Sequence, residues 1–370
     1  MPLTVAAASL VLWVIVLLLP WRPWSTRERI ERASQPHPEA TRVSVIIPAR
    51  DEAATIARTL RAVAAQGPLA RIVLVDDQSS DGTAARAREL ALPNLHLVEG
   101  ATPPAEWSGK LWALHQGLNH VETPYTLLLD ADIELAPGML DALLDRMVRE
   151  QRDLVSVMAR LSMASFWENL LIPPFIYFFK LIYPFALANG PSRWIAAAAG
   201  GCILVRTDVL RRIGGFAALR GALIDDCTLA RKVKDDGGST WLGLSHGVRA
   251  IRPYEGLAEI WNMVARTAFT QLRYSTGLLI ACTLLMCLAF VVPVVGAAAA
   301  TGPSRVLSIA AFGVMLTTYL PVLTYYRRGL GWLPTLPLAG ALYLAMTWTS
   351  AWRYWRGERS RWKNRVYQRD

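Results

Sequence analysis

Long apolar runs stand at both ends of the chain, with an ordinary mixture of polar and apolar residues between them. The first run covers residues 3–19 and contains neither a charge nor a proline. Three more follow over residues 277–300, 306–325 and 332–352, separated by arginines. A helix rises about 1.5 Å per residue, so each run reaches roughly 25 Å or more and can cross the apolar core of a bilayer. The pattern predicts one N-terminal and up to three C-terminal transmembrane helices flanking a soluble domain.

The first apolar run has a secretory signal peptide as its alternative interpretation. Signal peptides carry basic residues before the apolar stretch and a small-residue cleavage site after it, and this run has neither. Trp21, Arg22 and Trp24 follow instead. Aromatic residues and then basic ones are typical of the cytoplasmic end of a membrane helix. We therefore expect residues 1–21 to be an anchor whose N-terminus faces outward.

Between the apolar ends, short runs rich in β-branched residues alternate with stretches of helical periodicity. Buried strands are predicted over residues 43–47, 72–75, 95–98 and 125–129. Helices are expected over residues 52–66, from the turn at 79–82 to residue 90, and over 109–119. Strand and helix repeat within about thirty residues, which predicts an α/β fold with a doubly wound, mostly parallel sheet.

Polar residues follow three of the predicted strands where each strand ends. Arg50–Asp51–Glu52 comes after the first, Asp76–Asp77 after the second, and Asp130 with Asp132 after the fourth. Ligands of doubly wound sheets bind beyond the carboxyl ends of the strands, so these side chains predict a ligand site. No Gly-x-Gly-x-x-Gly follows the first strand, which disfavours a dinucleotide site.

Asp130 and Asp132 are spaced so that alternation along the chain directs both carboxylates the same way. Such hard oxygen ligands suit Mg²⁺ or Mn²⁺ held jointly with substrate phosphates. A solvated turn rich in aspartate is the alternative interpretation.

Three further clusters carry candidate chemistry. Asp225 and Asp226 begin a predicted helix, where acids cap the helix dipole or supply a general base. Gly200–Gly201 permits close backbone approach by a ligand or a bend before a strand. Lys110 stands at a predicted helix N-terminus, where an ammonium group and backbone N–H groups bind phosphate, or where a solvated lysine lies.

Two stretches outside the long apolar runs are also apolar enough to touch a membrane. Residues 257–274 have helical spacing of apolar positions, which indicates an amphipathic interfacial helix, with core packing as the alternative. Residues 166–189 are expected to be interrupted by Pro173, Pro174 and Pro184, as in interfacial or re-entrant helices.

Composition narrows the class of protein. Of the 370 residues 53% are hydrophobic, which excludes a disordered chain, and four cysteines are too few for a disulfide scaffold. The net charge is +10, and the last eighteen residues hold seven basic side chains against two acidic ones. This basic tail favours anionic lipid over nucleic acid. Three full C-terminal spans would place the tail opposite the soluble domain, against the positive-inside tendency; Pro334 and Pro337 favour a re-entrant last segment as the alternative.

Over residues 42–275 the chain resembles the family 2 inverting glycosyltransferases, which have a GT-A fold. Four stretches carry the resemblance in the family's order: VSVIIPARDEAATI, IVLVDDQSSDGT, LLLDADIELAPG and IDDCTLARK. It implies a nucleotide-sugar site formed by Pro48, Ala49, Arg50, Glu52, Asp76, Asp77, Lys110, Asp130 and Arg273. It also implies a Mg²⁺ or Mn²⁺ ion at Asp130 and Asp132, and Gly200 and Gly201 on the acceptor side. Asp226 would be the catalytic base, with Asp225 where the family usually has Glu.

The Gln-x-x-Arg-Trp motif of many membrane-bound members is matched here only by Arg273, with Thr270 and Tyr274 at the other two positions. This weakens the case for a processive polysaccharide synthase. The arrangement of apolar segments most resembles the bacterial hopanoid-biosynthesis-associated glycosyltransferases. The resemblance implies transfer from a nucleotide-diphosphate sugar, with uridine favoured, to a lipid hydroxyl such as that of a hopanoid, on the cytoplasmic side of the bacterial inner membrane.

The expected organisation is an anchor, a GT-A domain, an interfacial helix, a membrane region and a basic tail, over residues 1–21, 42–256, 257–275, 276–352 and 353–370. The alternatives within the enzyme class are a polysaccharide synthase and a polyprenyl-phosphate glycosyltransferase. A transporter is disfavoured because residues 277–300 and 332–352 contain no charges that could line a path. A non-catalytic scaffold that binds nucleotide sugars is the remaining alternative.

Overall fold

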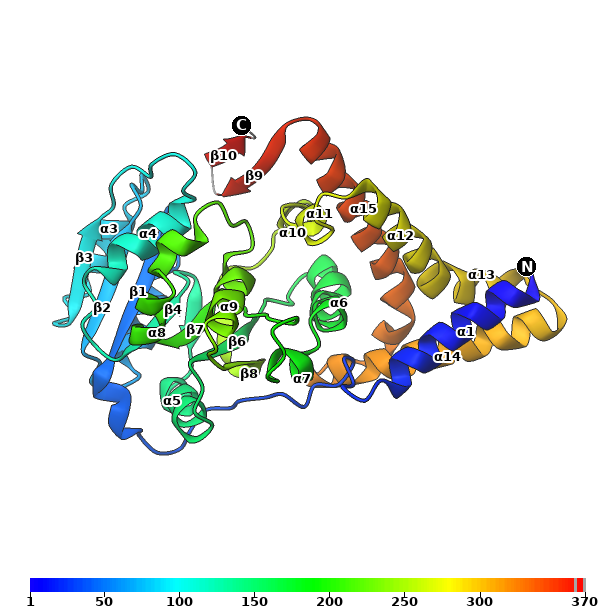
Figure 1. Ribbon diagram of the computed structural model, residues 1–370, viewed down its shortest axis with the longest axis horizontal. Helices are drawn as coiled ribbons and strands as arrows, with labels where there is room; N and C mark the ends of the chain where they lie inside the picture. The colour runs from blue at the N-terminus through cyan, green and yellow to red at the C-terminus, as the bar shows by residue number, and fades with distance from the viewer. Residues whose placement is uncertain (363–364, 369–370) are drawn as a thin grey trace. The chain divides into compact units, whose positions relative to one another are not determined.

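The computed structural model describes residues 1–362 and 365–368 (Figure 1). The chain divides into two compact units. One, which we call the sheet unit, comprises Glu28–Ser162 and Leu187–Pro253. The other, the helical unit, comprises Met1–Arg27, Met163–Ala186 and Tyr254–Asp370.

The sheet unit is built on eight strands in the order β3-β2-β1-β4-β7-β6-β8-β5. Their bounds are β1 Val43–Ala49, β2 Arg71–Asp76, β3 Leu95–Glu99, β4 Tyr125–Leu129, β5 Ile133–Leu135, β6 Leu154–Arg160, β7 Cys202–Arg206 and β8 Thr240–Ala250. The β1–β2, β1–β4, β2–β3 and β6–β8 pairs are parallel, whereas β7 runs antiparallel to β4 and β6, and β5 antiparallel to β8. This confirms the predicted α/β fold with a mostly parallel sheet.

Both faces of this sheet are covered, so its central strands are buried on each side. Val45 and Ile47 of β1 pack in one core cluster, and Ile46 between them packs in the other. A strand whose alternate side chains enter two different cores is mostly apolar, as β1 is. Its one polar side chain, Ser44, is buried, and its hydroxyl oxygen accepts from Thr123 Oγ1 at 2.9 Å. The helices of this unit are η1 Pro38–Arg42, α2 Ile56–Ala64, α3 Thr83–Arg88, α4 Gly109–Leu118, α5 Met139–Arg149, α8 Thr207–Arg212, η2 Gly215–Leu219 and α9 Asp225–Asp235.

The helix predicted to begin at residue 52 begins at Ile56 instead. Asp51 has a φ of 51°, in the left-handed region, so the chain turns here before a helix can start. The N–H of Thr55 closes the turn on the carbonyl of Glu52, at 3.0 Å. The polar residues after β1 are therefore held in a turn.

The helical unit contains three helices long and apolar enough to cross a membrane among the residues described: Thr276–Ala299, Gly302–Tyr325 and Leu330–Trp355. The first consists of α12 Thr276–Met286, the π-helical turn η3 Cys287–Val291 and α13 Val292–Ala299; the second is α14; the third consists of η4 Leu330–Thr335 and α15 Leu336–Trp355. The short strands β9 Glu358–Trp362 and β10 Arg365–Gln368 form an antiparallel pair.

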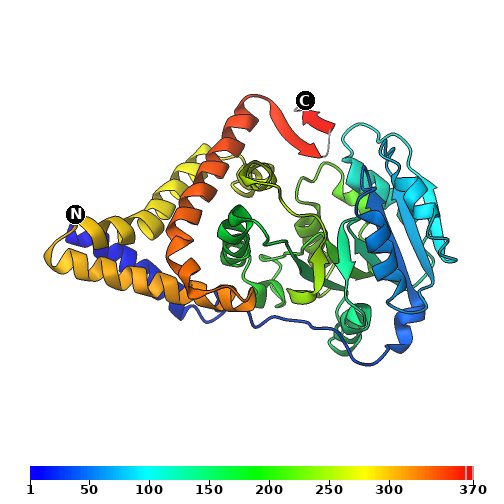
Figure 2. The same ribbon diagram turned by 180° about the vertical axis from the view of Figure 1, so that it is seen from behind.

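The N-terminal helix α1, Leu3–Leu18, is shorter than these three. It lies along α14, as the blue and orange ribbons of Figure 2 show. Ser9 Oγ donates to the carbonyl of Leu288 and Trp13 Nε1 to that of Ala289, both at 2.8 Å. Both carbonyls lie in the π-helical turn, so side chains of α1 supply hydrogen bonds where the regular helical pattern is interrupted.

Pro173 and Pro174 do not interrupt the chain as predicted, because α6 runs through them from Phe166 to Ile182. Proline removes the hydrogen bond to the carbonyl four residues earlier, and apolar helices tolerate this where neighbouring side chains supply donors. The carbonyls concerned are those of Asn169 and Leu170, and the next carbonyl along, that of Leu171, accepts from the Tyr343 hydroxyl at 2.8 Å. Only Pro184 coincides with a break, between α6 and α7 (Phe185–Ala188).

The single helix predicted over residues 257–274 is two, α10 Leu257–Ala265 and α11 Ala268–Gln271. The chain then turns through Arg273 and Tyr274, both with positive φ. The basic tail is described only in part, since residues 363–364 and 369–370 lie outside the described residues. At its start Arg353 donates to Asn262 Oδ1 at 2.7 Å, and the Arg356 guanidinium lies 4.6 Å from the centroid of the Trp352 ring.

Candidate active site

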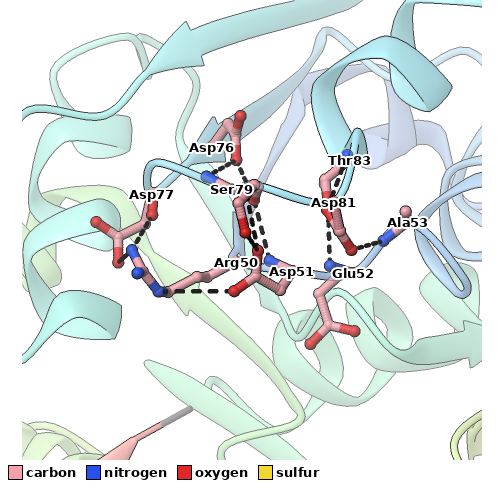
Figure 3. Close-up of polar contacts among 10 residues, drawn as sticks. Arg50, Asp51, Glu52, Ala53, Asp76, Asp77, Ser79, Asp81 and Thr83 are labelled. Carbon is pink, nitrogen blue, oxygen red and sulfur yellow. Dashed lines mark hydrogen bonds and ion pairs between the residues drawn. The ribbon is translucent and has the colours of Figure 1, made fainter. Parts of the chain in front are cut away.

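The loops that follow β1 and β2 are held together by side-chain hydrogen bonds (Figure 3). The N–H of Asp51 donates to Ser79 Oγ at 3.0 Å, and the N–H of Ser80 donates to Asp51 Oδ1 at 2.9 Å. Further along, the N–H of Ala53 donates to Asp81 Oδ2 at 2.8 Å. Aspartate and serine favour such turns because their short side chains reach nearby backbone groups. The loops after β1 and β2 therefore form a single hydrogen-bonded rim at the carboxyl end of the sheet.

Arg50 and Asp77 face each other inside this rim (Figure 3). Arg50 Nη1 donates to the Asp77 carbonyl at 2.6 Å and lies 3.7 Å from its carboxylate. The Asp77 side chain is fully buried, whereas that of Arg50 is 16% exposed. Arg50 Nε is buried and has no hydrogen-bond partner. Of this pair, Arg50 is thus the group that a ligand reaches first.

The other residues predicted at the first two strand ends have varied surroundings. Asp76 accepts hydrogen bonds from the N–H and the hydroxyl of Ser79. Ala49 is buried in β1, so its contribution is its carbonyl, which accepts from the Asp77 N–H at 2.8 Å. Pro48 is buried in the same strand and lines the pocket described below.

Glu52 is nearly buried, at 7% exposure, and its carboxylate accepts from Thr55 Oγ1 at 2.9 Å. The same carboxylate oxygen pairs with Arg252, just beyond the end of β8. Sequence reasoning did not single out Arg252, since two hundred positions separate the partners and no local pattern marks the pair. Glu52 therefore joins the first loop to the end of β8.

A small pocket opens at the carboxyl ends of β1 and β4. Its polar lining comes from Lys110, Asp130, Asp225 and Asp226, together with the backbone of Gly200. The structure thus brings together residues that the sequence carries in four separate segments. The rest of the lining is mainly leucine and isoleucine.

Lys110 lies between the carboxylates of this pocket. It stands in the first turn of α4, whose N-cap Ser108 accepts from the N–H of Leu111. Lys110 Nζ lies 2.6 Å from Asp130 Oδ1. Burial opposes the charge on this ammonium group, but the carboxylates of Asp130, Asp225 and Asp226 outweigh that effect and raise the pKa of Lys110. The pocket therefore contains a cation held among anions.

Asp226 begins α9 and is held by two backbone donors. The N–H of Gly200 donates to Oδ2 at 2.8 Å and the N–H of Cys227 to Oδ1 at 2.7 Å. Burial, followed by the neighbouring charge of Asp225, raises the pKa of Asp226 to about 6. A carboxylate with a raised pKa is a stronger base that is still ionised at neutral pH.

The antiparallel strand β7 is what brings Gly200 to this pocket, with Gly201 next to it in the chain. Cys202, its first residue, pairs with Leu129, the last residue of β4. Consequently the N–H of Asp130 donates to the carbonyl of Gly201 at 3.1 Å. A Cβ on Gly200 would lie 3.3 Å from Asp226 Oδ2 and 3.4 Å from Lys110 Nζ.

We expect Gly200→Ala to displace Asp226 and Lys110 by a few tenths of an ångström and to lower kcat by roughly tenfold, because catalytic groups tolerate little misplacement. Gly201→Ala is the matched control, since its Cβ would meet only apolar atoms, the nearest being Ile133 Cδ1 at 3.4 Å. Steady-state rates of both variants test this. Equal loss in the two would assign the effect to β7 rather than to the pocket.

Asp130 and Asp132 are the residues with the chemistry to hold a divalent cation. Both side chains are partly exposed at the end of β4. Among the residues described, no group of three or more His, Cys, Asp or Glu side chains is placed to hold a metal ion. Two carboxylates fit Mg²⁺ or Mn²⁺ where ligand phosphates and water complete the shell. Burial raises the pKa of the Cys202 thiol to about 12, so this neighbour stays uncharged.

Arg273 belongs to the helical unit, in the turn after α11. Its neighbour Tyr274 stacks on Tyr354, with ring centroids 4.3 Å apart, and also contacts Phe269. Tyr274, which occupies the Trp position of the Gln-x-x-Arg-Trp motif, therefore packs inside the helical unit.

Residues 44–214 match the family described as glycosyl transferase family 2. Over this segment, a little under half of the chain, the sequence is similar to that family. The match includes Arg50, Asp77, Lys110, Asp130 and Gly200, whereas Asp225 and Asp226 lie beyond it.

Relatives of the chain include two staphylococcal proteins named 4,4'-diaponeurosporenoate glycosyltransferase. That of Staphylococcus haemolyticus is 32% identical over 117 residues, 31% of this chain and 31% of the relative. That of Staphylococcus aureus is 29% identical over 129 residues, 34% of each chain. The chain thus spans about a third of the length of these curated relatives.

A solved structure resembles almost the whole chain. It is a mannosyltransferase from Pyrobaculum calidifontis in complex with GDP-Man and Mn²⁺, with a TM-score of 0.56 and 21% identity, and the likeness covers 91% of this chain and 99% of that one. At this identity the likeness shows the fold, which is GT-A.

Proposed function

We propose that this protein is a membrane-bound inverting glycosyltransferase that moves a sugar from a nucleotide-diphosphate donor to a lipid hydroxyl. The observation that carries the proposal is the meeting of Asp226, Lys110 and Asp130 around one pocket at the carboxyl end of the sheet. A base and a phosphate-binding cation in one pocket are the two groups that single-step sugar transfer needs.

In the proposed reaction the acceptor oxygen forms a bond to the anomeric carbon as the bond from that carbon to the diphosphate breaks. Asp226 takes the proton of the acceptor hydroxyl, and the diphosphate leaves with the electron pair. The donors from Gly200 and Cys227 orient the Asp226 carboxylate for this role. Lys110 offers its charge to the diphosphate. A Mg²⁺ or Mn²⁺ ion bound by Asp130 and Asp132 would neutralise further charge there.

Two observations support a lipid acceptor. Among the residues that the structure describes, the helical unit contains three helices that could cross a membrane, and the staphylococcal relatives are named for a lipid-like acceptor, diaponeurosporenoate. Within this class we propose a hopanoid hydroxyl as the acceptor and a uridine-based donor. We place the protein in the bacterial inner membrane with the sheet unit facing the cytoplasm. The packing of Tyr274 against Tyr354 gives no support to a polymer-forming reaction.

The decisive experiment incubates the full-length protein in lipid nanodiscs with a panel of nucleotide sugars and lipids, with and without Mn²⁺. The lipids should include a hopanoid alcohol, an apolar carboxylic acid and a polyprenyl phosphate. Mass spectrometry of the lipid fraction should show one hexose-sized addition that requires the metal. The proposal would be contradicted if the protein bound the donor but neither glycosylated a lipid nor hydrolysed the donor under any condition. That outcome would favour a non-catalytic scaffold.

The pH dependence offers a separate prediction. Because the pKa of Asp226 is raised from 3.8 to about 6, the base is protonated and inactive below that pH and ionised above it. We therefore expect kcat/KM to rise with pH through about 6 and then to level off. Rates measured across pH 4 to 8 in constant ionic strength would check this. An acid limb near pH 4 would mean that the base is an ordinary exposed carboxylate.

A further inference from the structure

Trp194 is the most exposed large apolar side chain of the sheet unit among the described residues. It is 88% exposed, and the only other large apolar side chain of this unit counted as exposed is Val148, at 43%. Exposed tryptophan is unfavourable in water, and its indole combines an apolar body with one polar N–H. Such a side chain is suited to a surface that is partly apolar and partly wet.

The segment that presents Trp194 is fixed by hydrogen bonds from α9. We call residues 189–195 the Trp194 loop. Lys234 Nζ donates to the carbonyls of Gly190, Ser192 and Ile195 at 3.0, 3.0 and 2.8 Å. An ammonium group has three donors, so all three are used on this loop. The exposure of Trp194 is therefore built into the structure.

Two further groups hold the same loop. Arg231 Nη2 donates to the Trp194 carbonyl at 2.9 Å, and Arg231 Nη1 donates to the Arg193 carbonyl. At the start of the loop the Asn189 side chain donates to and accepts from the backbone of Leu242, at 3.0 and 2.7 Å. The carbonyls of Gly190 and of Ser192 through Ile195 thus accept hydrogen bonds from α9, while the side chains of Arg193 and Trp194 are exposed.

The surroundings of the loop are positively charged. Burial, with the charges of Arg231 and Arg152, lowers the pKa of Lys234 to about 8. Arg193 adds an exposed guanidinium beside Trp194. Tryptophan next to basic residues is the combination found where proteins meet the headgroup region of anionic membranes.

The Trp194 loop is held by one end of α9, and the pocket lies at the other end. Arg231 and Lys234, which hold the loop, lie in the second half of this helix, and Asp226 lies in its first turn. Along the chain the loop leads through the buried Ala196 and Ala198 to Gly200, which donates to Asp226. The loop is therefore connected to the pocket through α9 and through the short segment between Ile195 and Gly200.

We propose that the Trp194 loop is a membrane-contact site of the sheet unit, in which the indole of Trp194 inserts among the headgroups of an anionic bilayer and Arg193 pairs with lipid phosphate. The bilayer is the environment expected of a chain with three helices able to cross it. The contact does not depend on the sugar transfer proposed above, so each can fail without the other.

The test places a fluorescent label beside Trp194 and leaves the indole in place. Ser192→Cys, at an exposed position of the loop, is labelled with bimane in the full-length protein, reconstituted in vesicles of phosphatidylethanolamine and phosphatidylglycerol. Cys282 and Cys287 are replaced by Ser, whereas Cys202 and Cys227 are buried and unreactive. Val148→Cys, labelled in the same way, is the control.

We expect lipids with a nitroxide near the headgroup to quench the label at residue 192, and aqueous iodide to quench it much less than the label at residue 148. Adding Trp194→Ser should restore iodide quenching at residue 192, and Trp194→Phe should restore it only in part. The proposal is overturned if the two labels are equally accessible to iodide, or if Trp194→Ser leaves the quenching unchanged.

Discussion

Replacing Asp226 with Asn should lower the rate of sugar transfer by roughly 10²- to 10⁴-fold, the usual contribution of a general base. An amide cannot take the acceptor proton, whereas it fills nearly the same space between the N–H groups of Gly200 and Cys227. Single-turnover measurement of transfer at saturating donor and acceptor isolates the chemical step. Titration of the donor onto the same variant should give a dissociation constant close to that of the wild type.

Asp235→Asn is the matched control for this variant, because Asp235 is an exposed residue at the other end of the same helix. It changes the net charge by the same amount and should leave the rate within about twofold, as surface substitutions do. Near-normal transfer by Asp226→Asn with intact donor binding would remove Asp226 from the mechanism. The expected acid limb near pH 6 should also be absent from the residual activity.

Replacing Asp130 with Asn should produce the second large loss, roughly 10²- to 10³-fold, because stabilisation of leaving-group charge contributes on that scale. The substitution removes a candidate metal ligand and also the partner of Lys110, 2.6 Å away. We expect the Mn²⁺ concentration needed for half-maximal donor binding to rise along with the loss of rate. Calorimetric titration of donor at several Mn²⁺ concentrations measures that shift.

Asp208→Asn serves as the control for Asp130→Asn. Asp208 is 55% exposed in the same unit, and its ion pair with Arg206 is of the surface kind that contributes little. If both variants keep wild-type metal dependence, Asp130 is not a metal ligand. If Asp130→Asn loses activity without any change in metal dependence, its pairing with Lys110 is the function that was lost.

Several site residues could be placed from local sequence alone. Apolar runs with β-branching mark strands, and the first polar residue after a run marks where the strand ends, so Asp76 and Asp130 were correctly expected at the carboxyl edge. Lys110 was likewise expected at a helix N-terminus, and it lies in the first turn of α4. These predictions work because burial and capping act over a few neighbouring residues.

Partnerships between distant segments could not be read in the same way. The pairing of Glu52 with Arg252 and the burial of Asp77 beneath Arg50 depend on which loops lie next to each other. From the sequence alone, a Glu or Asp after a strand could equally be buried in an ion pair or exposed to solvent. The continuity of α6 through Pro173 and Pro174 is likewise not visible in the local sequence, where paired prolines indicate a break.

By itself the sequence determined that apolar segments flank an α/β domain and that acidic residues end its strands, because hydrophobic periodicity and strand length are local properties. The tertiary structure decided which of those acids meet. Strand β7 inserts antiparallel beside β4, and its register, Cys202 opposite Leu129, sets Gly200 against Asp226 and Lys110. Strand order and register are fixed because the side chains on the two faces of the sheet must pack into two hydrophobic cores at once. Both cores are built from residues far apart in the chain, so no single stretch of sequence specifies them.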